Sequence, residues 1–286
     1  SAEDGHSGNI AIGYYALNAQ DAGADAYNVA IGFETGKTIT TGADNVLIGA
    51  FAGDALTTGG YNVAIGKNAL SAEDSHGYNV AIGRNALQNQ NAGANVYNVA
   101  IGYDAGVAVT TGSSITILGG LAGDALTAGG NSVAIGTQAL SSEDDHSFNV
   151  AVGARALESL NAGAHGYNTA VGHVAGTAMT TGVNNTLLGG VAGTALTTGS
   201  YNVAIGNSAL ASEDTGTRSV AIGWGALQRQ DYNGEANNVA IGHIAGEYIT
   251  TGVQNTLIGG LAGDALTIGT DNVAVGYLSL STEDVH

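Results

Sequence analysis

The chain has 286 residues, of which 47 are glycine, none is proline or cysteine, and only 10% are charged. Its formal net charge is −18, which disfavours a nucleic acid as partner because the phosphate backbone is also an anion. The lack of cysteine excludes disulfides and thiol chemistry, and no apolar run reaches the roughly 18 residues that a membrane-spanning helix needs.

A five-residue phrase, Asn62-Val63-Ala64-Ile65-Gly66 in its commonest form, recurs sixteen times. The intervals between the final glycines are 19, 17, 17 and 17 residues, and this pattern repeats every 70 residues. Self-similarity at such periods is typical of solenoids, in which each coil packs on its neighbours. We therefore predict one repeat domain over residues 1–286, built from four 70-residue blocks of four coils each.

The two ends of the chain fall in the same phase of the block, and neither carries an atypical capping unit. A free solenoid normally needs such caps, because an open strand edge pairs with other chains. We therefore expect the sequence to be an excerpt of a longer fibre. The alternative is that copies stack end to end.

The phrase predicts a short strand, because Val63 and Ile65 are β-branched and lie two residues apart on one face. We expect this face to be the core and the face of Asn62, Ala64 and Gly66 to point outward. The asparagines are interpreted either as a hydrogen-bonded ladder from coil to coil or as plain turn residues. No stretch sustains a helical period, so the fold class is all-β: a parallel β-solenoid, or β-roll, of sixteen coils.

The residue between the two β-branched positions is usually alanine, and once per block it is a large apolar residue. None of the sixteen is polar or charged, whereas a solvent-facing position should be polar in most coils. An unbroken apolar stripe usually marks an interface. We therefore predict that this stripe packs against partner chains in a homo-oligomer, a dimer or a trimer by symmetry. The interface residues are Leu47, Ala64, Ile117, Leu187 and Leu257.

An acidic turn occurs once per block, and in three of its copies a histidine follows two residues after the carboxylate pair. Two carboxylates and an imidazole could hold a divalent cation such as Ca²⁺. Copies four coils apart cannot share one ion, so we expect a solvated turn with no bound cofactor and at most a weak cation site. The candidate ligands are Glu73, Asp74, His76, Glu143, Asp144 and His146.

The 19-residue coil carries a second variable turn, whose two extra residues should bulge outward. Loops on a rigid scaffold are common binding elements, although a tolerated insertion would look the same. The candidate binding residues are Asp21, Asp25, Asn91, Asn95, Asn161, His165, Asp231 and Glu235. Tyr or Phe often precedes the asparagine of the phrase, where it could cover a strand end or stack on a sugar ring.

The phrase followed by a short alanine-containing turn resembles the repeats in head domains of trimeric autotransporter adhesins. It is similar also to repeats of bacteriophage tail fibres and bacterial surface fibres, which Asn168-Thr169-Ala170-Val171-Gly172 approaches closely. This resemblance covers the whole chain at the level of the repeat. It implies a left-handed roll assembled as a trimer.

The sequence contains no catalytic triad arrangement and no phosphate-binding loop, so we expect no enzyme. We predict a segment of an extracellular or cell-surface fibre, an adhesin head or stalk whose turns bind a host surface or a glycan. The alternatives are a bacteriophage tail fibre on a virion and a self-assembling filament of end-to-end protomers. An ice-binding protein and a carbohydrate-active β-helix are more remote alternatives.

Overall fold

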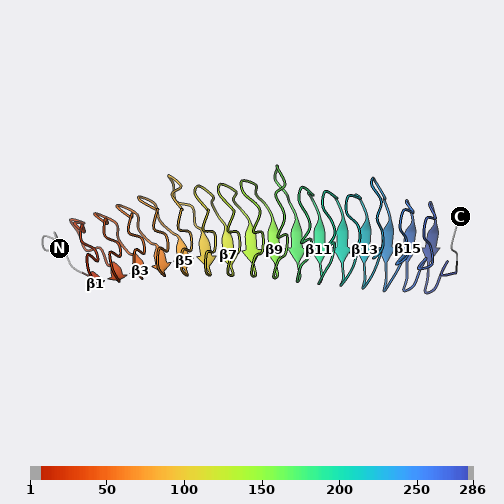
Figure 1. The fold of residues 1–286 in the computed structure, drawn as a ribbon, viewed down its shortest axis with the longest axis horizontal. Helices are drawn as coiled ribbons and strands as arrows, with labels where there is room; N and C mark the ends of the chain where they lie inside the picture. The colour runs from red at the N-terminus through yellow and green to blue at the C-terminus, as the bar shows by residue number, and fades with distance from the viewer. Residues whose placement is uncertain (1–7, 283–286) are drawn as a thin grey trace. The chain divides into compact units, whose positions relative to one another are not determined.

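The structure, a computed structural model, describes residues 8–282. The chain divides into two compact units, residues 1–145 and 146–286, and each contains eight three-residue strands. Among the described residues there is no helix. Within each unit every coil contributes one strand, and successive coils lie side by side in chain order (Figure 1).

The strands coincide with the repeated phrase. In the first unit they are β1 (Ile10–Ile12), β2 (Val29–Ile31), β3 (Val46–Ile48), β4 (Val63–Ile65), β5 (Val80–Ile82), β6 (Val99–Ile101), β7 (Thr116–Leu118) and β8 (Val133–Ile135). In the second they are β9 (Val150–Val152), β10 (Thr169–Val171), β11 (Thr186–Leu188), β12 (Val203–Ile205), β13 (Val220–Ile222), β14 (Val239–Ile241), β15 (Thr256–Ile258) and β16 (Val273–Val275).

Strand pairing within each unit is parallel and in register. Ile48 lies opposite Ile65, and the same one-to-one correspondence holds in the second unit, where Ala204 lies opposite Ala221. The predicted parallel β-solenoid with coils of 17 or 19 residues is therefore confirmed. Its handedness and its assembly state stay predictions.

The prediction of which strand face is buried was wrong. The central residue of each phrase points inward, and Leu47, Ala64, Ile117, Leu187 and Leu257 are all fully buried within the single chain. These five residues therefore cannot form an interface with a partner. The outward face instead carries the β-branched pair, which is half-buried at Val63 and Ile65 and more exposed in several other coils.

The asparagine of the phrase explains this orientation. Asn45 is fully buried, and both its backbone N–H and its side-chain Nδ2 donate to Oδ1 of Asn28 one coil earlier, at 2.9 and 3.0 Å. Its Nδ2 also donates to the carbonyl oxygen of Gly59 at 2.9 Å, which closes the far side of the coil. A buried amide requires such partners, so the Asn-Ala-Gly face must face the interior. The predicted asparagine ladder is confirmed.

The interior is filled at nearly constant volume, and this accounts for the alternation of leucine and glycine in the turns. A side chain at Gly53 would run into Leu56 Cδ1 at 2.8 Å and Leu47 Cδ2 at 3.0 Å. In the coil of Ala64, where the strand centre is small, the equivalent turn residue is the fully buried Leu70. Each coil therefore supplies its large side chains either from the turn or from the strand centre and second turn, as close packing requires.

Candidate functional site

The acidic turn of the second block is a structured cap rather than a solvated loop. Glu73 is fully buried, and its Oε1 accepts a hydrogen bond from the backbone N–H of His76 at 3.1 Å and lies 3.4 Å from Nδ1 of that ring. Burial raises the pKa of the Glu73 carboxyl. Its Oε2 is buried and has no hydrogen-bond partner among the described residues.

Coil stacking joins this turn to the 19-residue turn that follows. One ligand atom from each of Glu73, Asp74 and His76 lies within 4.8 Å of the others. Asp74 accepts a hydrogen bond from the Ser75 hydroxyl at 2.7 Å, and that bond is the main cause that lowers the pKa of Asp74, with a smaller contribution from Asn91 one coil later. Cation binding at this cluster stays a prediction.

The fourth block contains a related cluster that the sequence motif did not show. Glu213, Asp214 and Asp231 each offer an oxygen within 4.8 Å of the others, although the turn lacks a histidine. Asp231 belongs to the 19-residue turn and lies seventeen residues after Asp214, so the coil register was the signal that could have found it. In the third block Glu143 is buried and Asp144 is half-buried, and His146 begins the second unit. The remaining copies, at Glu3 and Glu283, lie outside the described residues.

All eight candidate residues of the 19-residue turns are exposed, as expected for bulges. The register shows where the extra residues sit: Asn91 N–H donates to the Thr110 carbonyl at 2.9 Å, and Ser114 N–H donates to the Val96 carbonyl at 2.7 Å. The insertion therefore falls between these bonds, where Gly93 adopts a φ of 70° with open space around it. The corresponding loops project beyond their neighbours in Figure 1.

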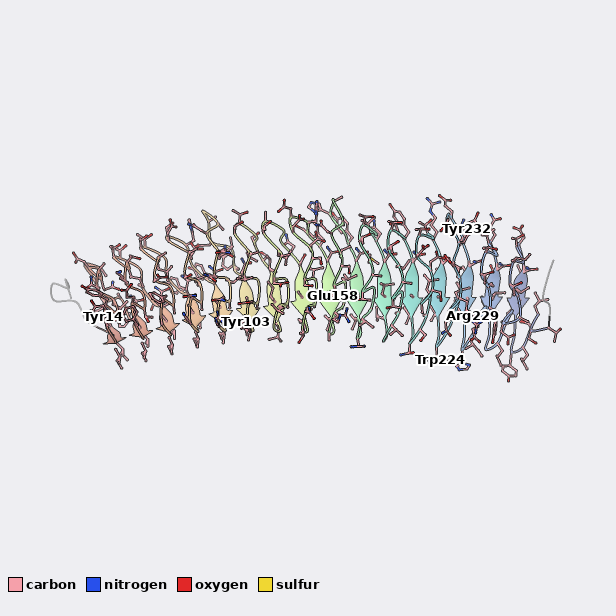
Figure 2. All side chains as sticks on the ribbon, in the orientation of Figure 1. Tyr14, Tyr103, Glu158, Trp224, Arg229 and Tyr232 are labelled. Carbon is pink, nitrogen blue, oxygen red and sulfur yellow. The ribbon has the colours of Figure 1, made fainter. Side chains whose placement is uncertain are left out.

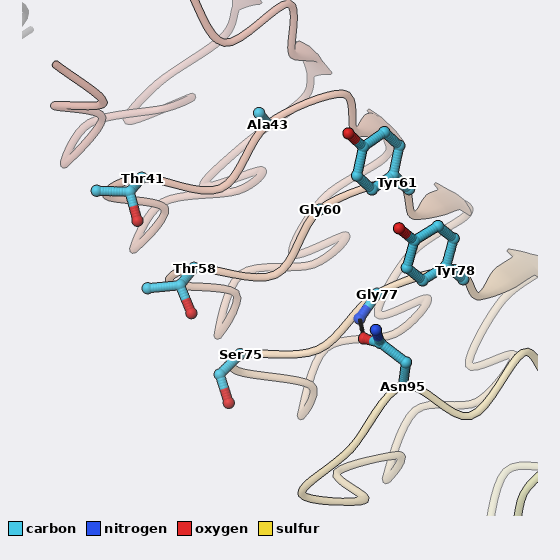
Figure 3. Close-up of a pocket in the computed structure, with 9 residues that line it drawn as sticks. All are labelled: Thr41, Ala43, Thr58, Gly60, Tyr61, Ser75, Gly77, Tyr78 and Asn95. Carbon is cyan, nitrogen blue, oxygen red and sulfur yellow. Dashed lines mark hydrogen bonds between the residues drawn. The ribbon is translucent and has the colours of Figure 1, made fainter. Parts of the chain in front are cut away.

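Beside the second of these turns the first unit has a surface groove of about 280 Å³. Figure 3 shows a column of hydroxyl side chains along one side of it, and parallel tyrosine rings along the other, with their hydroxyl groups on the side nearer that column. The hydroxyl column consists of Thr41, Thr58 and Ser75, one residue per coil. The sequence analysis missed this column, although the repeated Thr-Thr-Gly turn places such hydroxyls at a fixed offset from the asparagine.

The aromatic side of the groove is a stack of tyrosines. The rings of Tyr61 and Tyr78 lie parallel with their centroids 5.0 Å apart, and Tyr97 continues the stack at 5.2 Å. Each tyrosine directly precedes a buried asparagine and has a left-handed backbone, with φ values of 59° at Tyr61 and 66° at Tyr78. The ring therefore stays outside, 57% exposed at Tyr61, while the following amide enters the core.

Backbone and loop contacts shape the floor and one end of the groove. Gly60, Gly77 and Ala43 line the floor, and a side chain on Gly77 would collide with the Gly60 carbonyl of the preceding coil. Asn95, from the protruding turn, accepts a hydrogen bond from Gly77 N–H at 3.0 Å through its Oδ1. Of the eight predicted turn residues, Asn95 is thus the one that the structure places in this groove.

The opposite surface of the coils carries other aromatic groups, but they do not border a comparable groove. Trp224 stacks on His243 with ring centroids 5.2 Å apart, and Arg229 lies 4.3 Å from the ring centroid of Tyr248. Figure 2 shows Trp224 on the side of the coils away from Tyr232, which belongs to the fourth 19-residue turn. These contacts are ordinary coil-to-coil packing of surface side chains.

Comparison with known proteins identifies no relative: no family model, no curated protein and no solved structure matches the chain. In residues 8–282 the structure also contains no helix long and apolar enough to cross a membrane.

Proposed function

We propose that the chain is a non-enzymatic segment of an extracellular or surface fibre, an adhesin head or stalk, that self-associates through its outward sheet face. The observation that carries this proposal is the apolar character of that face. Within each unit the outward residues of adjacent strands form two rows, and nearly all of them are Val, Ile or Leu. Among them Leu118 is 44% exposed and Ile258 is 39% exposed.

Such a surface favours association with copies of the same chain. Apolar area exposed over many consecutive strands exceeds what monomeric proteins usually leave in water, and pairing identical faces about a symmetry axis would bury it. Thr116, Thr169, Thr186 and Thr256 are the only polar residues in these rows, and their methyl groups still allow close packing. The resemblance to adhesin heads and phage fibres favours three chains over two.

Charge and repetition also agree with a fibre. A net charge of −18 keeps the remaining surface soluble, and the repeat presents similar turns at regular intervals. Association of chains would multiply each weak binding site, which increases the strength of attachment without new contacts.

The test is a pair of charge substitutions on the outward face of the second unit, Leu188→Asp with Ile258→Asp. We expect the parent chain to have a multiple of its 28.1 kDa monomer mass, threefold for a trimer, by light scattering. The double variant should show a large fall in mass with an unchanged circular dichroism spectrum. Thr198→Asp with Thr251→Asp adds the same charge at exposed turns and should leave the mass unchanged.

A monomeric parent chain, or a double variant that keeps the parent's mass, would contradict self-association through this face. Electron microscopy of the native source distinguishes the members of the fibre class. Anchored cell-surface projections would support an adhesin, fibres on virions a bacteriophage tail fibre, and free polymers a structural filament.

A further inference from the structure

We propose that the groove between the Tyr61–Tyr78 stack and the hydroxyl column of Thr41, Thr58 and Ser75 binds a neutral oligosaccharide. This inference rests on the proposed function, because it names the ligand class of a surface fibre. It concerns one place in the first unit, not the repeat in general.

The chemistry of the lining matches a polyhydroxylated ligand. Hydroxyl groups donate and accept hydrogen bonds, and the groove offers them from both sides, with the Asn95 amide at one end. Among the described residues the hydroxyls of Thr58, Tyr61 and Tyr78 have no protein partner, so they are available to a ligand. The edges of the tyrosine rings add apolar surface for the C–H groups of a sugar ring.

Charge excludes the main competing ligands. None of the nine lining residues is charged, and the acidic Asp44 directly follows Ala43 of the floor. An anionic ligand such as a phosphate or a sulfated glycan would therefore find no counter-charge and a repulsive surrounding. A hydrophobic peptide would find too little apolar surface between hydroxyl groups and backbone.

The groove has a defined length. It covers three coils, and coils stack roughly 4.8 Å apart, so the hydroxyl column spans about 10 Å between its first and last members. The turn containing Asn95 rises at one end, and the turn containing Asp25 precedes the other, because Asp44 N–H donates to the Ala26 carbonyl at 2.7 Å. A short oligosaccharide lying along the column fits between these bulges.

The equivalent surface of the second unit serves as an internal control. There Ser200 replaces Gly60 of the floor, Tyr201 corresponds to Tyr61, and Arg218 replaces Tyr78. The Arg218 guanidinium pairs with Glu235 of the 19-residue turn at 2.6 Å. The tyrosine stack is thus absent, an ion pair occupies the position of its second ring, and we expect no neutral glycan to bind there.

The experiment uses the full chain on a printed array of neutral oligosaccharides, with sialylated and sulfated forms of the same structures as charge controls. We expect binding to a subset of the neutral glycans and weaker binding to their anionic forms. On the best neutral probe, Thr58→Val should weaken binding about three- to tenfold, the value of one hydrogen bond, without altering side-chain volume greatly. Tyr78→Ala should weaken it by about tenfold or more.

Tyr201→Ala, the matched change in the second unit, should leave the affinity within about twofold of the parent, as expected for a residue outside the interface. Circular dichroism of each variant checks folding, and Thr58→Val decides the matter if Tyr78→Ala fails to fold. The proposal is overturned if no neutral glycan binds, if only anionic glycans bind, or if Thr58→Val leaves binding unchanged. Should binding fail while the chain still associates through its outward face, the ligand class is wrong and the fibre proposal stands.

Discussion

The acidic turns of the two units bury the same carboxylate but differ in the groups that donate to it. In the first unit Glu73 accepts from His76 at its Oε1, and its Oε2 has no partner among the described residues. In the second unit Glu213 Oε1 accepts from Gly216 N–H at 2.7 Å, and its Oε2 accepts from Gln230 Nε2 at 2.8 Å. One fold position thus holds a half-satisfied and a satisfied buried acid.

The difference originates one coil away, in the asparagine ladder. Ser219 replaces asparagine there, and Gln230 Nε2 donates both to the Ser219 hydroxyl, at 2.9 Å, and to Glu213. The equivalent Gln90 directs its Nε2 to the Thr110 carbonyl at 3.2 Å instead. Both glutamines accept from the next ladder asparagine, so the substitution redirects only the free end of the side chain. The acidic turn is therefore primarily a structural cap, tuned by its neighbours.

The largest expected effect comes from removing the two carboxylates. Glu213→Ala leaves donors of Gly216 and Gln230 without their acceptor and should lower the free energy of unfolding by about 2–4 kcal/mol. Glu73→Ala leaves one donor and also removes a buried unpaired oxygen, so about 1 kcal/mol is expected. Urea unfolding measures both, and amide hydrogen exchange near each turn localises the change. Equal losses would show that the unpaired Oε2 has no energetic consequence.

An exchange of the histidine should have a smaller, asymmetric effect. A side chain at Gly216 would collide with the Glu213 carboxylate, so Gly216→His must displace that group from Gln230 and should cost about 1–3 kcal/mol. His76→Gly removes an imidazole that is not required for the cap and should cost less than about 1 kcal/mol, mostly as backbone entropy. The same unfolding measurements test this pair, and a larger loss for His76→Gly than for Gly216→His would contradict it.

The smallest effect is the pH dependence of the two acids. Burial raises the pKa of both Glu73 and Glu213, so the folded state binds each proton more tightly than the unfolded chain does. The resulting stabilisation is complete below the unfolded pKa of about 4.3 and is lost as pH rises through the folded pKa. The isosteric variants Glu73→Gln and Glu213→Gln lack this loss.

Stability measured from about pH 4 to pH 7 should therefore fall in the parent chain relative to each glutamine variant. The difference should level off above the folded pKa. Asp54 and Asp124, whose pKa values burial also raises, contribute equally to parent and variant and cancel. A difference that stays constant with pH, or that changes in the opposite direction, would show that the carboxyl is not desolvated in solution.

Much of the fold could be predicted from the sequence because the repeat is strict. The position of every strand, their parallel register and the asparagine ladder follow from one phrase at fixed intervals. The inward face could not be read from the alternation, because both faces of the phrase carry apolar residues. The decisive signals were the buried-amide requirement of Asn45 and the exchange of Leu47 with Leu70 as the large interior side chain, and both depend on contacts between coils.

The groove was predicted only in part. The bulging turn with Asn95 and the exposed tyrosines could be identified as candidate binding elements. Their meeting with Thr58 could not, because it depends on the left-handed backbone at Tyr61 and Tyr78, which turns the rings outward. Local propensity disfavours that conformation for tyrosine, and only the packing of the next residue imposes it.

The asparagine ladder also has a genetic consequence. Its Oδ1 acceptors all serve the next coil in the chain, as Asn185 and Asn202 do within the second unit, so every coil presents the same directional connection to its successor. Duplication or deletion of a whole 70-residue block would restore the same junction and the same core volumes. Changes in the number of blocks by recombination between repeats would therefore alter the length of this protein without disturbing its cross-section, whereas a single-residue insertion inside a phrase would break the register.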